Sequence, residues 1–459
     1  MAIKRLFVAN RGEIAVRILR TAKALGIETV LGVSAADRDS MGAQMATRAV
    51  VLGPAPSAKS YLDVNLVVHA AKATGCDALH PGYGFLSEKP ILSKMCAEEG
   101  IIFVGPRAET IESLGDKLGG RAMARAAGVQ TVPGTDHIAT LQDAKAAARE
   151  LGYPVVMKAS AGGGGRGMFK AIDEAALDAS FDRASREALA AFGDSRLYME
   201  RFVERARHVE VQIVGDGEGK VIHFGERDCT VQRRYQKLIE EAPASAVPAD
   251  TRRRLHEAAV RLTSHARYRN AGTVEFLYDV DRDDFYFIEV NSRIQVEHPV
   301  TEETTGLDLI ALQLRVAAGE GLGLEQHDVR VAGHAIEIRV NAEDPARDYA
   351  PSPGRITEWS APTGPGVRLD THACAGYLVP PFYDSMIGKL IVSGADRAQA
   401  LDRLKAAIDS FRLTGPKTTL PLAAFIVSHP DFRDNRITTR WLEDLGPFES
   451  ARSSAHGAH

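Results

Sequence analysis

The sequence predicts an α/β fold that continues into α+β units, and three observations lead to this prediction. Over residues 1–112, short apolar runs alternate with amphipathic stretches, which is the rhythm of an open parallel sheet. Between about 204 and 330, strand-like segments join through hairpin turns instead. A glycine-rich run at 162–167 lies between these parts. The 459 residues are enough for about three domains.

The first unit, residues 1–112, is expected to be a Rossmann-like domain. Apolar residues predict a strand at Arg5–Ala9 and a helix at Glu13–Leu25, which ends at Gly26. Asn10-Arg-Gly-Glu13 carries one glycine where a dinucleotide-binding loop carries three, so dinucleotide binding is disfavoured. Further strands are expected at 29–34, 77–80 and 101–104, and a second helix at 63–74.

A second domain is expected at 115–330, and its first part, 115–203, is a small α+β unit around the glycine run. Apolar segments flank Gly162-Gly163-Gly164-Gly165-Arg166-Gly167, which places these glycines at the tip of a hairpin. Glycine backbones can approach a ligand closely, so we expect a lid that orders over phosphates. A flexible surface linker is the alternative. Helices are expected at 117–127, 141–151 and 174–192.

The remainder of the chain divides into an antiparallel part and a C-terminal domain. Residues 209–214 and 221–224 flank a glycine-rich turn, and a helix is expected near 252–267. A C-terminal mixed α/β domain is expected at 334–446, followed by a disordered tail at 447–459. Its strands are expected at 335–340 and 389–392, and its helices at 397–411 and 419–428.

Composition excludes several classes of protein. Lysine and arginine number 56 against 60 aspartates and glutamates, so the net charge of −4 gives no bulk attraction to nucleic acid or to membranes. The four cysteines have no C-x-x-C spacing, which argues against structural zinc and suits a reducing cytosol. No apolar stretch approaches the roughly 18 residues of a membrane span, and no signal peptide is recognisable. A cytoplasmic protein is therefore expected.

A pair of carboxylates across a predicted hairpin is the strongest chemical signal. If the strands around 273–278 and 285–291 pair symmetrically about Arg282, Glu275 faces Glu289, and Asn291 lies on the same face. Opposed like charges destabilise a sheet, and a divalent cation reverses that penalty. Carboxylate and amide oxygens suit Mg²⁺ or Mn²⁺ bound to nucleotide phosphates. The alternative is that both glutamates face solvent.

The segment that follows adds a second polar set. Asn291, Arg293, Gln295 and Glu297 alternate, so they share one face if the segment is extended. A guanidinium beside a carboxamide suits a small planar oxyanion, and a nearby carboxylate suits a base. The alternative is a polar sheet face without a catalytic role.

Two lysines fit the neutralisation of phosphates. Lys117 begins a predicted helix, and Lys158 ends the strand before the glycines. A solvated surface position is the alternative for each. His208, on a strand with alternating polar residues, is expected to be structural when it is considered alone.

Taken together, these segments resemble the biotin carboxylase subunit of biotin-dependent carboxylases, which has an ATP-grasp fold. The resemblance runs from about Lys4 to Leu445. It rests on the Lys158 glycine loop and on the motifs Ala9-Asn-Arg-Gly-Glu-Ile-Ala15, His80-Pro-Gly-Tyr-Gly-Phe-Leu-Ser-Glu88, Arg227-Asp-Cys229 with Gln232-Arg-Arg234, Arg293-Ile-Gln-Val-Glu-His-Pro299, Asn341-Ala-Glu-Asp-Pro345 and Tyr383-Asp-Ser-Met-Ile-Gly-Lys389.

The resemblance implies ATP- and Mg²⁺-dependent carboxylation of biotin by bicarbonate, through carboxyphosphate. Glu297 would then be the base, and Arg339 would stabilise the biotin enolate. The residues that would hold bicarbonate and biotin are Lys237, Arg293, Gln295, Val296 and Arg339. The metal ligands would be Glu275, Glu289 and Asn291. Those that would contact ATP are Lys117, Lys158, Gly163, Gly164, Gly165, Glu200, Val203, His208, Gln232, Glu275 and Glu289.

The chain departs from the family pattern at one position and lacks two expected parts. Tyr235 stands where the family usually has histidine, and a phenol carries no proton charge at neutral pH. No Ala-Met-Lys-Met biotinylation site and no carboxyltransferase domain is recognisable. We therefore expect a biotin carboxyl carrier protein and carboxyltransferase subunits on separate chains, and the resemblance implies a homodimer. The final carboxyl acceptor is not indicated by the sequence.

Two other interpretations stay open at this point. The first is a different ATP-grasp ligase that activates a carboxylate, such as half of a carbamoyl-phosphate synthase or a purine-pathway carboxylase. Arg293-Ile-Gln-Val-Glu297 and Arg339 argue against it. The second is a non-catalytic relative that regulates a carboxylase complex, which the intact Glu275, Glu289 and Lys237 disfavour.

Overall fold

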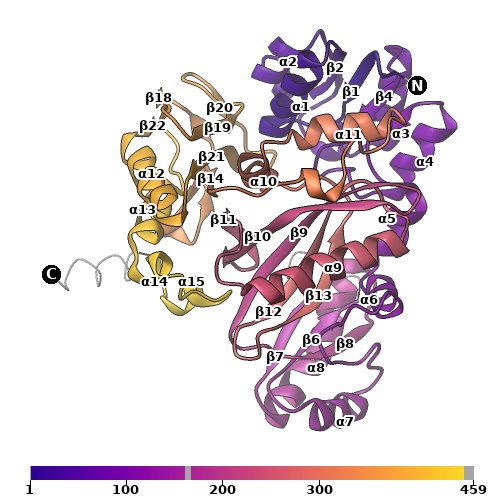
Figure 1. The fold of residues 1–459 in the computed structure, drawn as a ribbon, viewed down its shortest axis with the longest axis vertical. Coiled ribbons are helices and arrows are strands. Elements are labelled where there is room, and N and C mark those ends of the chain that lie inside the picture. Colours follow the sequence, from indigo (N-terminus) through magenta and orange to yellow (C-terminus); the bar gives the residue numbers. More distant parts are fainter. Residues whose placement is uncertain (1, 161–166, 449–459) are drawn as a thin grey trace.

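The computed structural model describes residues 2–160 and 167–448 (Figure 1). It opens with a five-stranded sheet in the order β3-β2-β1-β4-β5, in which all strand pairs are parallel. The predicted parallel N-terminal sheet is therefore confirmed. The strands are β1 (Arg5–Val8), β2 (Glu28–Ser34), β3 (Arg48–Gly53), β4 (Ala78–His80) and β5 (Ile102–Phe103).

Helices cover both faces of this sheet because alternate strand residues are apolar on both sides. Ile14 and Ile18 share one buried core with Leu6, whereas Phe7 belongs to the core on the opposite side. The helices of this unit are α1 (Gly12–Ala24), α2 (Met41–Met45), α3 (Val64–Ala73), α4 (Pro90–Glu98) and α5 (Ala108–Gly115).

A small three-stranded antiparallel sheet in the order β7-β6-β8 follows. Lys158 pairs with Met168 across β6 and β7, so the strands expected on either side of the glycine run do pair. Gly163, Gly164 and Gly165 lie outside the described residues, and the lid stays a prediction. The elements of this unit are α6 (Lys117–Ala126), α7 (Leu141–Leu151), β6 (Val155–Ala159), β7 (Met168–Ala171), α8 (Glu174–Phe192) and β8 (Leu197–Arg201).

The central sheet has eight antiparallel strands in the order β13-β12-β9-β10-β11-β14-β21-β19. β11 pairs with β14, so the sheet runs without a break from the hairpins into the C-terminal part. Its strands are β9 (Ala206–Asp216), β10 (Val221–Arg233), β11 (Gln236–Ala242), β12 (Arg269–Asp279), β13 (Asp284–Asn291), β14 (His334–Asn341), β19 (Val367–Thr371) and β21 (Met386–Gly394). The helices that pack on it include α9 (Ala249–His265), α10 (His298–Thr305) and α11 (Leu309–Ala317).

β10 extends well beyond the predicted end at residue 224. Its second half carries Arg227, Asp228 and Gln232, which are buried polar residues, so apolar periodicity gives no strand signal there. A two-residue turn at Arg234 and Tyr235, both with positive φ, leads into β11. The Tyr235 side chain is 54% exposed on this turn.

The C-terminal part packs helices on β14 and β21 around its own core (Figure 1). Phe448 is buried in that core, and residues 449–459 lie outside the described part. Among the described helices, none has both the length and the hydropathy that a membrane crossing requires. The remaining elements are β15 (Glu343–Asp344), β16 (Ala350–Pro351), β17 (Gly354–Arg355), β18 (Glu358–Ser360), β20 (Leu378–Val379), α12 (Arg397–Ser410), β22 (Arg412–Thr414), α13 (Leu420–Ser428), α14 (Pro430–Arg433) and α15 (Trp441–Asp444).

Candidate active site

Glu275 and Glu289 face one another across β12 and β13, as the hairpin symmetry predicts. A β-bulge after Glu275 then shifts the pairing by one residue, so Phe276 pairs with Phe287. The two carboxylates have unequal surroundings. Glu275 Oε1 accepts hydrogen bonds from Lys237, Asn291 and Gln295. The nearest cation to Glu289 is Lys117, with Nζ 3.8 Å from Oε2.

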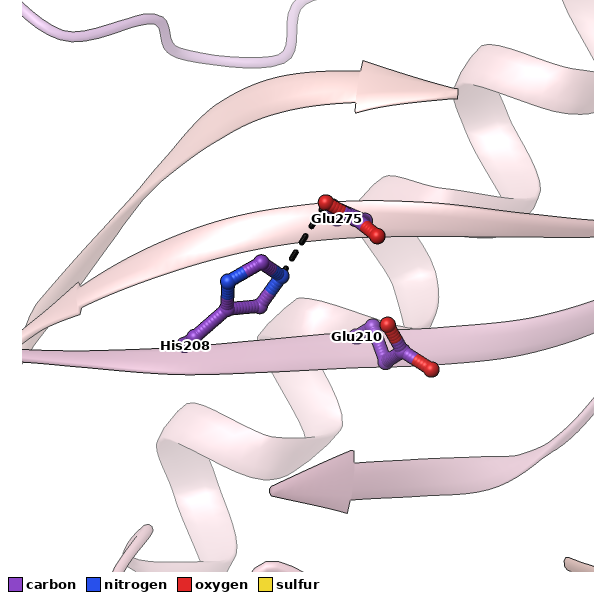
Figure 2. Close-up of side chains that lie close together, drawn as sticks. All are labelled: His208, Glu210 and Glu275. Carbon is purple, nitrogen blue, oxygen red and sulfur yellow. Dashed lines mark ion pairs between the residues drawn. The ribbon is translucent and has the colours of Figure 1, made fainter. Parts of the chain in front are cut away.

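This pair fits a divalent cation. Burial raises the pKa of Glu289, and the facing Glu275 raises it further. Burial also acts to raise the pKa of Glu275, but Lys237 and His208 outweigh it and hold that pKa below its usual value. His208 Nε2 lies 3.0 Å from Glu275 Oε2 on the neighbouring strand, as Figure 2 shows. In the part of the chain that the structure describes, Glu289 is thus a carboxylate without a close donor, beside one that is already ionised. Among the described residues, Asn291 Oδ1 accepts one hydrogen bond, from Arg293 at 3.1 Å, which leaves its second lone pair for a ligand.

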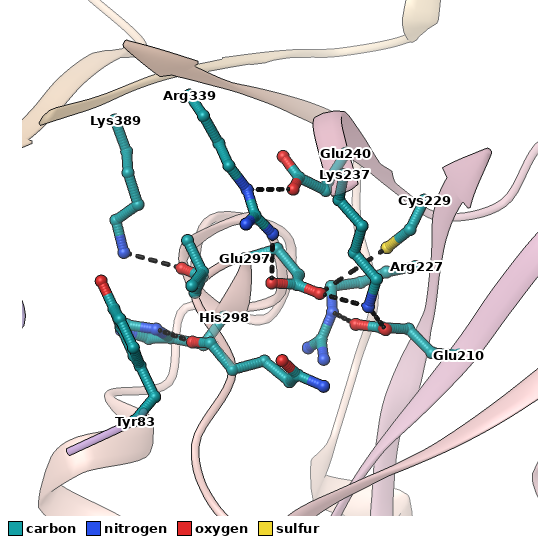
Figure 3. Close-up of polar contacts among 12 residues, drawn as sticks. Tyr83, Glu210, Arg227, Cys229, Lys237, Glu240, Glu297, His298, Arg339 and Lys389 are labelled. Carbon is teal, nitrogen blue, oxygen red and sulfur yellow. Dashed lines mark hydrogen bonds and ion pairs between the residues drawn. The ribbon is translucent and has the colours of Figure 1, made fainter. Parts of the chain in front are cut away.

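Lys237 on β11 lies at the centre of the site and contacts several of its carboxylates (Figure 3). Its Nζ donates to Glu210 at 2.5 Å, to Glu275 at 2.8 Å and to Glu297 at 2.7 Å. Burial acts to lower the pKa of Lys237, but these three carboxylates raise it well above its ordinary value. Lys237 therefore stays charged and ties the hairpin of Glu275 to the start of α10.

Glu297 precedes α10 and is fully buried between two cations. Its Oε1 accepts from Lys237, and its Oε2 accepts from Arg339 Nη2 at 3.0 Å (Figure 3). Burial acts to raise the pKa of Glu297, but Lys237, Arg339 and Arg227 hold it well below the usual range. Arg339 is itself anchored by Nε on Glu240 Oε1 at 2.7 Å.

Two buried residues of this cluster were not among the predicted site residues. Glu210 on β9 receives Lys237 on one oxygen and Arg227 Nε on the other, at 2.6 Å. Arg227 also donates to Gln212, Thr273 and Thr301, so it links three strands and α10. The polar alternation of His208, Glu210 and Gln212 was the available signal, but a lone polar strand face is usually structural.

The segment after β13 is irregular rather than extended, because the chain turns into α10. Arg293 still contacts two other residues of the predicted face: its Nη2 donates to Asn291, and its Nη1 donates to Gln295 Oε1 at 2.8 Å. Glu297 leaves this group and turns toward Lys237 instead. The expected alternation on one face therefore holds for the first three residues and ends before Glu297.

The other predicted residues divide between two regions. Lys158 Nζ lies 2.5 Å from Glu200 Oε2, and Arg121 holds the other oxygen of this buried glutamate. Gln232 is buried on β10 and donates to the carbonyl of Cys229. Val203 lies in a small separate apolar cluster and makes no polar contact with the Lys237 group.

A cavity of about 550 Å³ opens beside the Lys237 cluster. Its lining includes Lys237, Val296 and Arg339, together with Tyr83 and Phe382. The Val296 carbonyl accepts from the buried Lys389 at 2.7 Å, which fixes the loop that borders the cavity. The lining combines Arg11, Lys237 and Arg339 with Glu13, Glu343, Asp384 and apolar side chains, which suits a neutral, partly polar ligand.

Family models match nearly the whole chain. Residues 2–111 match the N-terminal domain of biotin carboxylase, and residues 337–444 match its C-terminal domain. Residues 116–325 match the ATP-binding domain of the carbamoyl-phosphate synthase L chain. The outer two models distinguish this chain from a carbamoyl-phosphate synthase.

Similar proteins agree with these models. Biotin carboxylase from Nostoc sp. is 47% identical over 446 residues, which cover 97% of this chain and 100% of that one. Biotin carboxylase 1 from Bacillus subtilis is also 47% identical, over 96% of this chain and 98% of that one. A biotin carboxylase complex with β-γ-ATP from Campylobacter jejuni has a TM-score of 0.93 at 44% identity, over 96% of this chain and 99% of that one.

A further solved structure is the biotin carboxylase domain dimer of 2-oxoglutarate carboxylase from Hydrogenobacter thermophilus, in complex with MgADP and bicarbonate. It has a TM-score of 0.92 at 43% identity, over 97% of this chain and 98% of that one. Identity of this extent over the full length establishes the family as well as the fold. The chain belongs to the biotin carboxylase family of ATP-grasp ligases.

Proposed function

We propose that this chain uses ATP to carboxylate the biotin of a carrier protein, with Glu297 as the base that activates bicarbonate. The observation that supports this proposal best is the position of Glu297, which is buried between Lys237 and Arg339 beside the cavity. The relative from Hydrogenobacter was solved with MgADP and bicarbonate, which are the ligands that the proposal needs.

Phosphate binding is assigned to the region between α6 and the small sheet. Lys117 and Lys158 supply positive charge, and Lys117 begins a helix, whose N-terminus favours anions. His208, Glu200 and Gln232, with Val203, are proposed to contact the nucleotide. Mg²⁺ or Mn²⁺ held by Glu275, Glu289 and Asn291 supplies charge neutralisation for the phosphates when it is bound.

Bicarbonate is proposed to lie against Lys237, Arg293, Gln295 and Val296. Its negative charge competes with Glu297 for Lys237, which raises the pKa of that carboxylate toward the range of a general base. Glu297 then accepts the bicarbonate proton, and a bicarbonate oxygen attacks the γ-phosphorus as ADP leaves.

The resulting carboxyphosphate breaks its carbon–oxygen bond to give CO₂ and phosphate. Phosphate takes the N1 proton of biotin, and N1 forms the new bond to CO₂. Arg339 stabilises the negative charge that develops on the ureido oxygen. The cavity beside Arg339 has room for the bicyclic ring.

The domain organisation and the partner subunits are proposed to be those of biotin carboxylase subunits. Three domains are assigned to 1–112, 115–330 and 334–446, and the carrier and carboxyltransferase to separate chains. A homodimer is supported by the dimeric Hydrogenobacter relative. A relative from Methanothermobacter that is 46% identical over 96% of this chain and 89% of its own length belongs to a pyruvate carboxylase. The final acceptor is therefore not fixed by the family alone.

The experiment that tests the proposed function is fixation of labelled bicarbonate onto free biotin. The purified chain with ATP and Mg²⁺ is expected to give acid-labile carboxybiotin, and omission of ATP is expected to abolish it. Label that appears in carbamoyl phosphate or in another acyl phosphate would support a different carboxylate-activating ligase. Normal ATP binding without any labelled product would support a non-catalytic relative.

A further inference from the structure

Two glutamates that the mechanism leaves unused face one another behind Arg339. Glu240 on β11 pairs directly with Glu337 on β14, and cross-strand partners project from the same face of a sheet. Both side chains have 0% exposure. Like charges in this arrangement repel at close range, and neither has water to screen it.

Most of the oxygens of this pair lack partners. Glu240 Oε1 accepts from Arg339 Nε at 2.7 Å. Within residues 2–160 and 167–448, neither Glu240 Oε2 nor either oxygen of Glu337 has a hydrogen-bond partner. An ionised carboxylate in that condition is costly, whereas one proton between the two groups supplies the missing donor.

The surroundings favour the retention of that proton. α10 packs over this face of β11, β14 and β21, and an apolar cluster of Ala242, Val300, Ala335 and Ile391 borders the pair. Ile391 is the cross-strand partner of Glu337 on its other side. The charged groups that act on the pair are Arg339, Lys389, Lys237 and Glu297.

Arg339 and Lys389 also bind other carboxylates, so each offsets only part of the negative charge of Glu240 and Glu337. Arg339 also binds Glu297, and Lys389 is paired with Glu13 at 3.1 Å. Burial, and to a smaller extent the facing Glu240, raises the pKa of Glu337 well above its usual value. Burial raises the pKa of Glu240 to about 7, against the opposing effect of Arg339.

We infer that Glu240 and Glu337 share one proton, and that Glu337 as the neutral acid donates to Glu240 Oε2 and so positions Glu240 to anchor Arg339. The inference rests on the proposed role of Arg339 toward biotin. Glu337 touches no substrate in this scheme and acts only through Glu240. Loss of the shared proton at alkaline pH leaves two facing anions, which moves Glu240 and releases the Arg339 guanidinium from its place beside the cavity.

The inference is tested by two variants that differ only in hydrogen-bonding ability. Glu337→Gln keeps a donor of similar size, whereas Glu337→Met removes it. We expect Glu337→Met to raise the KM for biotin by roughly tenfold, the cost of about one buried hydrogen bond, with the KM for ATP unchanged. Glu337→Gln is expected to restore the KM for biotin to near the wild-type value at neutral pH.

The pH profile separates positioning from a simple packing role. Wild-type kcat/KM for biotin is expected to fall at alkaline pH as the pair loses its proton, and Glu337→Gln is expected to lack that fall. The exposed Glu358→Gln on β18 is the matched control and should follow the wild type. If Glu337→Gln behaves like Glu337→Met at every pH, the shared proton is not what positions Arg339, and the inference is wrong.

An infrared measurement tests the proton without relying on activity. The difference between wild type and Glu337→Gln at neutral pH is expected to contain the C=O stretch of a protonated carboxylic acid. Absence of that band overturns the inference even if the enzyme is active. A band found in a protein that does not fix bicarbonate onto biotin leaves the pair in place and contradicts the proposed function instead.

Discussion

Lys237 Nζ donates to Glu297 Oε1 at 2.7 Å, and the side chains of both residues are nearly or fully buried. Each side chain comes from a different part of the chain: Lys237 from β11 and Glu297 from the residue before α10. The contact keeps Glu297 ionised before substrate arrives. A base that is ionised in advance can accept a proton as soon as an anion displaces the lysine, so this pair couples bicarbonate binding to activation.

Glu297→Gln is expected to lower kcat by roughly 10²–10⁴, the usual range for loss of a general base. The amide fills the same space and still accepts from Lys237, so ATP affinity should change little. Steady-state kinetics and nucleotide binding measure the two effects. The exposed Glu320→Gln is the control for loss of one negative charge. Near-normal turnover in Glu297→Gln would remove Glu297 from the mechanism.

Glu289→Gln is expected to abolish productive Mg²⁺ binding, and Glu275→Gln to weaken it. Glu289 has no hydrogen-bond donor at close range among the described residues, so its charge is available to a cation, whereas Glu275 is already shared among Lys237, His208 and Asn291. The loss should exceed the roughly 10–100-fold that outer-shell changes cause. Titration of ATPase activity with Mg²⁺ measures it, with the exposed Glu204→Gln as control. Unchanged Mg²⁺ dependence in both variants would refute the metal assignment.

Stability is expected to fall as pH drops below about 6.5, in part because His80 is buried as the neutral tautomer. Nδ1 accepts from the Gly82 amide, and Nε2 lies 3.1 Å from Gln313 Oε1. Burial lowers the pKa of His80 to about 4, so between that pH and about 6.5 only the unfolded chain binds the proton. The unfolded state is therefore favoured on acidification.

Between about pH 6.5 and pH 5 this single group accounts for a loss of about 1–2 kcal/mol in the free energy of unfolding. Denaturant titrations at both pH values should show that His80→Gln loses less stability over this interval than the wild type does. The exposed His69→Gln serves as control. Equal losses in the wild type and His80→Gln would show that His80 does not titrate in this way.

Tyr235→His is expected to keep the fold and the metal site and to change the kinetic constants for biotin or carrier more than those for ATP. The residue lies on an exposed turn with φ of 65°, a conformation that histidine tolerates comparatively well. The same turn leads into Lys237 on β11, so we expect the effect of the ring to reach the site through that strand. Tyr235→Phe separates the hydroxyl from the ring. If only ATP constants respond, or none do, Tyr235 is a neutral replacement.

The N-terminal sheet could be predicted because it rests on local patterns, whereas the correctly predicted Glu275–Glu289 pairing depends on a bulge that the sequence does not signal. Short continuous apolar runs define β1 and β2, and an amphipathic stripe defines α1, without reference to the rest of the chain. The register at the turn, where Asp279 pairs with Asp284, would by itself place Ile288 opposite Glu275, and the bulge after Glu275 restores the predicted pair with Glu289.

The sequence does not reveal features that depend on distant partners. In sequence, Arg227 and Glu210 look like ordinary polar strand residues. Their role follows from contacts that only the fold creates: Glu210 accepts from Arg227 and Lys237, and Arg227 donates to Thr301. Pairing of β11 with β14 joins segments about a hundred residues apart, and it creates the facing carboxylates that no local pattern contains. The chain turns into α10 directly after Glu297, and the partner that Glu297 then meets, Lys237, lies 60 residues away in sequence.

The most direct measurement of the central claim is phosphate release from ATP, with and without bicarbonate and with and without free biotin. The proposed site binds both ligands next to Glu297, so we predict that Mg²⁺-dependent ATP cleavage needs bicarbonate and is stimulated by biotin. Omission of bicarbonate should abolish the stimulation, and Glu297→Gln should not respond to either ligand. Equal phosphate release in all four conditions would contradict the assignment of this site to the carboxylation of biotin.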